Sequence, residues 1–242
     1  MDKLRYTITI IEENEIKDIC LNDYNKNIIS FGRGLNNDIK LSSLLVSSNH
    51  GYFEILENGV KVVDNNSTNG IFINNNKVDS AILKDGDSIK IDNPDEPLDK
   101  GIIMIFTLGD IVNKWQQYDL NSKDIISIGR DNSCDIVLDH VSIALNQVNI
   151  YKKDNKFILN VINSNNNVFI NGKLVNGNFI LKDRDVILIS NAKLIYSKGR
   201  IIYQMYDKGV SVDAVDIVKT VKVRGKKRDI SYHVNLSIKP GQ

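Results

Sequence analysis

The sequence predicts an all-β protein that contains a tandem duplication. Its apolar runs are short, rich in Ile and Val, and bounded by Asn, Asp, Ser or Gly, which is typical of antiparallel sandwiches and barrels. No segment keeps a 3.6-residue apolar period over three turns, so we expect little helix. A set of polar loop motifs occurs twice, at an offset near one domain length, which indicates that a whole unit has been duplicated.

Each expected strand is a run of alternating or continuous apolar, often β-branched residues that ends at a turn-forming residue. In the first half the expected strands are residues 6–11, 28–31, 51–56, 60–63, 71–73, 88–91 and 102–106. In the second half they are residues 125–128, 148–151, 157–161, 168–170, 186–189 and 193–196. A further alternating segment begins near residue 212. We therefore expect two duplicated units, residues 1–106 and 107–206, followed by a third segment, residues 207–242.

Composition narrows the class of protein. Hydrophobic residues make up 42% of the 242 residues and charged residues 25%, as in soluble globular proteins. The net charge of +1 argues against a nucleic-acid partner, which normally requires a basic excess. Cys20 and Cys134 fall in different units, so we expect free thiols in a reducing compartment. With no signal peptide and no run near the ~20 apolar residues of a membrane span, we expect a cytoplasmic location.

The repeated motifs lie in polar loops, which usually carry function because a rigid scaffold holds them. In the first unit the motifs are Gly32-Arg33, Asp38-Ile39, the run from Ser47 to His50 and the run from Asn66 to Gly70. In the second unit they are Gly129-Arg130, Asp135-Ile136, the run from Ser142 to Leu145 and the run from Asn163 to Asn167. The step from Arg to Asp is five residues in both copies.

The first set of loops has the chemistry of an anion site. The planar guanidinium of Arg33 can grip an oxyanion with two hydrogen bonds, and Ser47 adds a hydroxyl. Asn69 offers an amide that can bond the main chain of a peptide, and Gly70 leaves room beside it. The set includes neither a catalytic base nor a metal cluster. We therefore predict a protein that binds phosphate without cleaving it, with no catalytic residues, cofactor or metal.

These motifs resemble the forkhead-associated (FHA) domain, a family of phosphothreonine-peptide readers, and the resemblance covers residues 1–206 in two copies. It implies two tandem sandwiches of about eleven strands each, with a short β segment after them. It also implies that Arg33 and Ser47 contact the phosphate, that Asn69 holds the peptide backbone, and that Thr68 shapes the pocket for the threonine methyl group. Ser48 stands where the family often has Arg or Lys, so we expect a weaker phosphate contact there.

The same resemblance gives structural roles to further residues of the first unit. His50 matches the family histidine that braces the loops, and Gly32 and Gly70 support the turns. A catalytic role for His50 is disfavoured, because no carboxylate or serine completes a triad. Taken alone, Arg33 could simply be a surface arginine that pairs with Asp38. The Ser, His and Asn motifs that follow it favour phosphopeptide binding instead.

The second unit keeps fewer of the motif residues. By the resemblance, Arg130, Ser142 and Asn166 match the binding residues, whereas Leu145 replaces the histidine, Asn165 the threonine and Asn167 the glycine. Asn tolerates the left-handed conformation that Gly provides, so the turn can persist. Two interpretations stay open: the second unit binds phosphothreonine weakly, or it serves architecture alone.

The end of the chain carries a second resemblance. Asn235-Leu236-Ser237-Ile238-Lys239-Pro240-Gly241 is similar to the first strands of an ABC-type ATPase domain, in which the Walker A loop soon follows. No G-x-x-x-x-G-K-[ST] motif occurs in this chain, so we expect no enzyme activity from it. We interpret it as the N-terminal part of an FHA-containing ABC transporter ATP-binding protein that ends before Walker A, with residues 207–242 starting the ATPase-like domain.

These observations combine into one functional hypothesis. The chain is expected to be a regulatory module at the cytoplasmic face of the membrane, docking a phosphothreonine segment of the same protein or of a partner. The implied partners are a substrate of a Ser/Thr kinase and the membrane portion of the transporter. The alternative is a phospho-independent scaffold or dimerisation module of a membrane transport or secretion ATPase.

Overall fold

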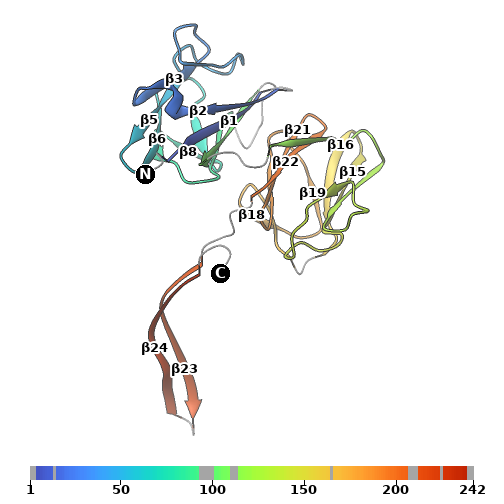
Figure 1. Ribbon diagram of the computed structural model, residues 1–242. Helices are drawn as coiled ribbons and strands as arrows, with labels where there is room; N and C mark the ends of the chain where they lie inside the picture. The colour runs from blue at the N-terminus through green and yellow to red at the C-terminus, as the bar shows by residue number, and fades with distance from the viewer. Residues whose placement is uncertain are drawn as a thin grey trace. The chain divides into compact units, whose positions relative to one another are not determined.

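A computed structural model describes residues 4–12, 15–92, 101–109, 114–163, 166–206, 212–223 and 226–238. It confirms the all-β prediction, with two β-sandwiches in tandem and a separate β-hairpin (Figure 1). Residues 1–205 form one compact unit, and residues 206–242 form another. Within the described ranges, the one helix is a 3-10 turn, η1 (Leu21–Tyr24).

The first sandwich pairs a six-stranded sheet with a five-stranded sheet. In sheet order, the six strands are β2 (Glu15–Cys20), β1 (Tyr6–Glu12), β11 (Ile102–Leu108), β10 (Ser88–Ile91), β7 (Ile71–Ile73) and β8 (Asn76–Val78). The five strands are β4 (Ile39–Lys40), β3 (Ile28–Gly32), β5 (Gly51–Leu56), β6 (Gly59–Asp64) and β9 (Ser80–Ile82). Neighbours pair antiparallel except β3 and β4, which are parallel.

The second sandwich repeats this topology. Its six strands, in sheet order, are β12 (Gln116–Asp119), β22 (Arg200–Met205), β21 (Ala192–Ser197), β20 (Val186–Ile189), β17 (Val168–Ile170) and β18 (Lys173–Val175). Its five strands are β14 (Ile136–Val137), β13 (Ile125–Gly129), β15 (Val148–Lys153), β16 (Lys156–Val161) and β19 (Asn178–Ile180). The parallel pair recurs as β13 and β14.

All of the strands that the apolar pattern predicts are present, and each lies within or coincides with an observed strand. The pattern missed the short or polar strands, such as β4, β8 and β12, because two to four residues carry too little periodicity to be recognised. β11 continues to Leu108, two residues past the expected end of the first unit. The end of one strand does not define a domain boundary, so the domain limits 1–106, 107–206 and 207–242 stay a prediction.

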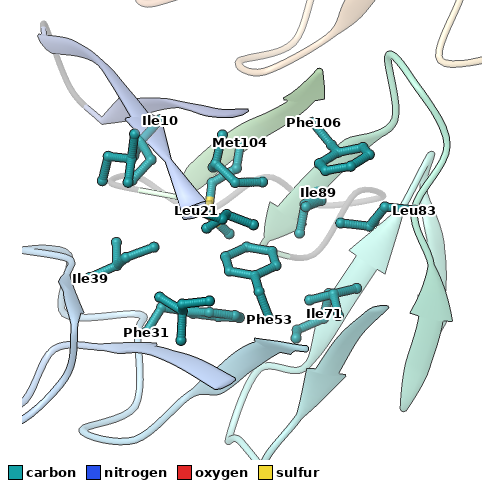
Figure 2. Close-up of a cluster of buried hydrophobic side chains, with 14 of the residues drawn as sticks. Ile10, Leu21, Phe31, Ile39, Phe53, Ile71, Leu83, Ile89, Met104 and Phe106 are labelled. Atoms are coloured by element: carbon teal, nitrogen blue, oxygen red, sulfur yellow. The ribbon is translucent and has the colours of Figure 1, made fainter. Parts of the chain in front are cut away.

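The core of the first sandwich lies between its two sheets. Figure 2 shows Phe31 and Phe53 of the five-stranded sheet pointing toward Met104 and Phe106 of the six-stranded sheet. The rings of Phe31 and Phe53 lie 4.9 Å apart and are fully buried. Burial of aliphatic and aromatic side chains of this size contributes about 1.5–3 kcal/mol each, so this layer is a rigid support for the loops at its end.

The two sandwiches also bury a surface between them. Ile11, Ile103 and Ile105 of the first six-stranded sheet form one apolar cluster with residues of the second, namely Val186, Ile195 and Ile202. These side chains lie on the sheet faces that point away from each sandwich core, where an isolated sheet would meet water. The second sandwich therefore covers the outer face of the first.

Polar contacts join the same two faces. The guanidinium of Arg184 is buried and forms an ion pair with the buried carboxylate of Asp92. Lys90 Nζ donates to Asn171 Oδ1 at 3.3 Å, and Lys193 Nζ donates to Gly86 O. Burial lowers the pKa of both lysine ammonium groups to about 8. A buried charge without a partner is unfavourable, so the sandwiches must meet in the one arrangement that brings Arg184 and Asp92 together.

The compact unit of residues 206–242 contains an antiparallel hairpin of β23 (Val212–Val223) and β24 (Lys226–Ile238) (Figure 1). The pairing of these two strands has register shifts along its length. The alternating segment expected near residue 212 is thus a strand. In the part of the chain that the structure describes, no helix has the length and apolar character needed to cross a membrane.

Candidate functional site

The loop that carries Arg33 leaves β3 at a point of close backbone contact. A Cβ atom on Gly32 would overlap Ser48 O and come within 2.9 Å of His50 N. Arg33 N then donates to Ser47 O at 3.0 Å, which ties this loop to the next one. Glycine is required at position 32 because two backbone segments meet there.

The side chain of Arg33 is exposed, and its Nε donates to Val46 O at 3.3 Å. This bond holds the base of the guanidinium. Within the described residues, no carboxylate forms an ion pair with it, and the alternative pairing of Arg33 with Asp38 does not occur. The two terminal nitrogens are thus available for an anion.

Asp38 braces the loop instead. Its Oδ2 accepts hydrogen bonds from Ser30 N and Ser30 Oγ, both at 2.8 Å, and its Oδ1 pairs with Lys26 Nζ. Although burial acts to raise the pKa of Asp38, the hydrogen bonds from Lys26 and Ser30 lower it overall. The repeated Asp-Ile motif is therefore a structural fastener at the end of β3.

Ser47 bridges two loops. Its Oγ accepts a hydrogen bond from Thr68 N at 3.1 Å and lies 3.4 Å from Thr68 Oγ1. Ser47 is half-buried, whereas Ser48 and Thr68 are exposed. The carbonyl of Ser48 accepts from Gly34 N at 2.9 Å, so the backbone of this exposed residue is engaged in the loop. Two hydroxyl groups, those of Ser47 and Thr68, therefore meet at the rim of the loops.

His50 connects the same loops from below. It is fully buried, Ser47 N donates to its Nδ1 at 3.0 Å, and its Nε2 lies 3.3 Å from Gly70 O. Because Nδ1 accepts, we assign the proton to Nε2, which donates to Gly70 O. Burial lowers the pKa of this imidazole, against the opposing effects of Gly70 O and Asp64. His50 is thus a neutral brace between the two loops.

Asn69 and Gly70 end the loop that follows β6. Asn69 Nδ2 donates to Leu45 O at 2.7 Å, which leaves the side-chain carbonyl to accept a hydrogen bond from a ligand. Gly70 has φ +77°, a conformation that side chains rarely adopt. Ser67 Oγ accepts from Gly70 N at 2.9 Å and donates to Asp64 Oδ1. The turn is thereby held from both sides.

Sequence reasoning missed one cation beside these loops. Lys77 lies on β8, opposite Phe72, and its Nζ is 3.3 Å from the point where a Cβ of Gly70 would stand. Lys77 is exposed. No spacing rule marks it, because β8 comes after the motifs and meets them only through strand pairing. Lys77 thus adds a second cation beside the loop that ends at Gly70.

The assembled first site presents two cations, two hydroxyl groups and an amide. Among the described residues, no cluster of His, Cys, Asp and Glu could hold a metal ion. The donors suit a phosphate ester, and the buried His50 is occupied at both nitrogens, so it is not placed to act as a general base.

Backbone hydrogen bonds show which residues of the second sandwich correspond. Arg130 N donates to Ala144 O at 2.9 Å, as Arg33 N donates to Ser47 O at 3.0 Å. Ala144 therefore holds the place of Ser47, and the expected match of Ser142 with Ser47 is wrong. Ser142 lies two residues earlier, because the loop has the same length in both repeats and the serine does not recur.

The place of His50 belongs to Gln147, so the match with Leu145 is also wrong. Ala144 N donates to Gln147 Oε1 at 3.1 Å, just as Ser47 N donates to His50 Nδ1. Gln147 is fully buried, whereas Leu145 is exposed on the loop. The brace has not been lost in the second repeat; an amide has replaced the imidazole.

Of the other candidate residues of the second repeat, one keeps the geometry of its counterpart in the first repeat and one does not. Arg130 keeps the geometry of Arg33, since its Nε donates to Ile143 O at 3.2 Å and its side chain is exposed. Asn166 Nδ2 donates to Gln147 Oε1 at 3.2 Å, so its amide is turned to the brace. Asn165 lies outside the described residues.

Ser142 lines an open pocket of about 420 Å³ with Asn166, Asn167, Phe169, Leu188 and Ser190. Its Oγ is bonded to His140 Nδ1 at 2.6 Å and to Ser190 Oγ. The counterpart of Lys77, counted at the same 97-residue separation as Arg33 and Arg130, is Leu174, which is exposed. The second loop end therefore keeps one arginine and lacks the hydroxyl and the lysine of the first.

Comparison with known proteins agrees with this arrangement. The FHA domain family matches residues 29–92 and 126–190, which together are more than half of the chain. Over 67 residues the chain is 39% identical to the ABC transporter ATP-binding/permease protein Rv1747 of Mycobacterium tuberculosis, covering 28% of this chain and 8% of that protein. Over 64 residues it is 42% identical to the glycogen accumulation regulator GarA of the same organism, covering 26% of this chain and 40% of GarA.

The chain thus spans less than half the length of both relatives. Among solved structures, the crystal structure of the first FHA domain of Rv1747 covers 44% of this chain and 99% of that domain, at 24% identity and a TM-score of 0.35.

Proposed function

The chain belongs to the FHA domain family, and from this premise we propose that its first sandwich binds phosphothreonine peptides through Arg33, Ser47 and Asn69. FHA domains are binding modules for phosphothreonine proteins and peptides. The observation that supports this assignment is the convergence of two loops on Ser47, whose hydroxyl bonds to Thr68 N beside the loop of Arg33.

Each residue has a role in the proposed mechanism. Arg33 grips the phosphate with its terminal nitrogens, and the hydroxyl group of Ser47 adds a third donor. Asn69 accepts from or donates to the peptide backbone beside the phosphothreonine, and Thr68 bounds the pocket for the methyl group. Gly32, His50 and Gly70 keep the loops in place. Discrimination against unphosphorylated threonine comes from charge-assisted hydrogen bonds, about 1.5–3 kcal/mol each.

In the same proposal, the second sandwich serves architecture. Ala144 has no hydroxyl group, the amide of Asn166 is bonded to Gln147, and Leu174 replaces the lysine. Its outer sheet face instead covers that of the first sandwich. This supports the architectural interpretation over weak phosphothreonine binding.

For the whole protein, we propose that this module belongs to an ABC transporter. Two observations support this proposal: the segment that matches Rv1747, and the resemblance of residues 235–241 to the start of an ABC-type ATPase domain. A Ser/Thr kinase would phosphorylate the segment that docks, which lies on the same protein or on a partner at the cytoplasmic face. The second candidate, a phospho-independent scaffold of a transport or secretion ATPase, is favoured by one observation, the altered binding loops of the second sandwich.

Fluorescence polarisation with a degenerate library of labelled phosphothreonine peptides tests the proposal. The full chain should bind the library, and Arg33→Ala should weaken binding at least a hundredfold while leaving the melting temperature unchanged. Arg130→Ala is the matched control, since the same exposed arginine occupies the second repeat, and it should change binding less than twofold. Equal binding of unphosphorylated peptides would favour the scaffold instead.

A further inference from the structure

The five-stranded sheet of the second sandwich carries an apolar row on its outer face. Strand pairing places Ile125 opposite Tyr151, Tyr151 opposite Ile158, and Ile158 opposite Ile180, across β13, β15, β16 and β19. Ile125 is 57% exposed and Ile180 50% exposed, and the two central residues are half-buried. None of the four belongs to the core of the sandwich.

The first sandwich shows that the fold does not require this row. The equivalent register places Ile28 opposite Glu54, Glu54 opposite Lys61, and Lys61 opposite Ile82. The two central positions are therefore charged in the first sandwich and apolar in the second. A continuous exposed apolar surface in a water-soluble sheet usually marks an interaction site.

One side of the row is basic. Lys153 and Lys156 face each other in the register at the open end of β15 and β16, two residues beyond Tyr151 and Ile158 on the same sheet face. Both are exposed, and among the residues that the structure describes neither has an ion-pair partner. Asp154 lies in the turn between them. The opposite side of the row is polar, and the carboxylate of Asp135 there is bonded to Ser127 and paired with Lys123.

The polar side consists of the next register positions, where Asn149 pairs with Ser127 and Asn160 with Asn178. A partner that lies along the row therefore meets lysines on one flank and amides on the other. Its matching surface is an apolar strip with acidic residues along one edge.

The interval between the side chains of the row indicates whether the partner segment is helical or extended. Neighbouring strands lie about 4.8 Å apart, so the four side chains repeat at that interval. One turn of an α-helix rises 5.4 Å, whereas same-face residues of a strand repeat at about 6.7 Å. A helix laid across the strands matches the row more closely than an extended segment does.

We propose that the row Ile125, Tyr151, Ile158 and Ile180 is a docking surface for an amphipathic helix of a partner protein with acidic residues along one edge of its apolar face. The helix lies across the four strands, with its acidic edge over Lys153 and Lys156. This surface shares no residue with the phosphopeptide loops, which belong to the first sandwich.

The test uses the full chain and a synthetic helical peptide of about 15 residues, labelled with fluorescein. Leucines recur every three or four residues on one face, and glutamates line one edge of that face. We expect saturable binding that Ile125→Ser with Ile180→Ser weakens at least tenfold. The matched control, Ile28→Ser with Ile82→Ser, removes two isoleucines of the first sandwich that are 54% and 65% exposed, and it should change binding less than twofold.

Charge reversal gives a second, independent readout. Lys153→Glu with Lys156→Glu should weaken binding of the glutamate peptide at least tenfold, and a peptide with lysines along the same edge should regain it. No binding by the unaltered chain, or equal binding by all variants, would overturn the proposal. Two further results would also overturn it: a dimer of the chain in sedimentation, or binding of the chain to anionic vesicles, if Ile125→Ser with Ile180→Ser abolishes that dimer or that binding.

Discussion

His50 and Gln147 hold equivalent places in the two repeats, and each accepts a hydrogen bond from the backbone of the loop above it. Ser47 N donates to His50 Nδ1 at 3.0 Å, and Ala144 N donates to Gln147 Oε1 at 3.1 Å. On its other side, His50 faces Gly70 O, while Gln147 Nε2 donates to Asn163 O and Asn166 O. An imidazole and a primary amide thus perform the same structural task.

This relationship predicts that His50→Gln folds and keeps its loops. The amide can accept from Ser47 N and donate to Gly70 O, as its counterpart does in the second repeat. His50→Ala leaves both groups without their buried partner, which costs about 2–3 kcal/mol of the free energy of unfolding. Urea denaturation of the two variants measures the difference, and equal destabilisation would contradict a hydrogen-bonding role.

The same brace predicts a pH dependence of stability. Burial lowers the pKa of His50 in the folded protein, so between this pKa and about 6.5 the unfolded chain binds more protons. Stability should therefore fall as the pH drops from 7 through 6.5 and should level off below the folded pKa. In His50→Gln this contribution is absent, and a pH series of urea midpoints compares the two proteins. Parallel curves would show that His50 does not titrate differently in the two states.

Lys77 should strengthen phosphopeptide binding. Its ammonium group lies beside Gly70, close to the loops of Arg33 and Ser47, and exposed charge pairs contribute about 0.2–1 kcal/mol. Lys77→Ser should thus weaken binding two- to fivefold, and the effect should shrink in high salt. Lys61→Ser, which removes a lysine from the sheet face, is the matched control in the same polarisation assay. An equal loss in both variants would indicate a general charge effect.

The buried pair between the sandwiches should respond strongly to the loss of one partner. Asp92→Ala removes the more deeply buried of the two carboxylates that pair with Arg184, while Asp183 stays paired with its guanidinium, so we expect a loss of about 1–3 kcal/mol. The double variant Asp92→Leu with Arg184→Met should recover part of this loss, since it removes both buried charges and leaves only the partly exposed carboxylate of Asp183 without its cation. Chemical denaturation measures each variant. If the single variant unfolds like the unaltered chain, the pair does not stabilise the interface.

The motifs of the first repeat could be found from the sequence because each lies within a few residues of a strand end. Gly32-Arg33 follows a β-branched strand, and the rest occur in a fixed order, so local spacing was sufficient. In the second repeat, residue identity predicts Ser142 as the counterpart of Ser47, whereas the spacing from Arg130 predicts Ala144. Loop length, and not residue identity, was the reliable guide, because the backbone bonds recur and the side chains do not.

Other features depend on residues that are distant in the sequence. Lys77 reaches the loops only because β8 pairs with β7, and the row from Ile125 to Ile180 exists only through the register of four strands. A shift of one residue in any strand would move its side chains to the opposite face. Local patterns carry no information about such register.

By itself, the sequence determined the all-β class, the duplication and the order of the motifs around Arg33, because these follow from local periodicity and spacing. The tertiary structure alone decided that Ala144 and Gln147 occupy the places of Ser47 and His50, and that Arg184 and Asp92 are buried together. Those relationships arise when strands far apart in the chain pair and their faces exclude water, which happens only in the folded molecule.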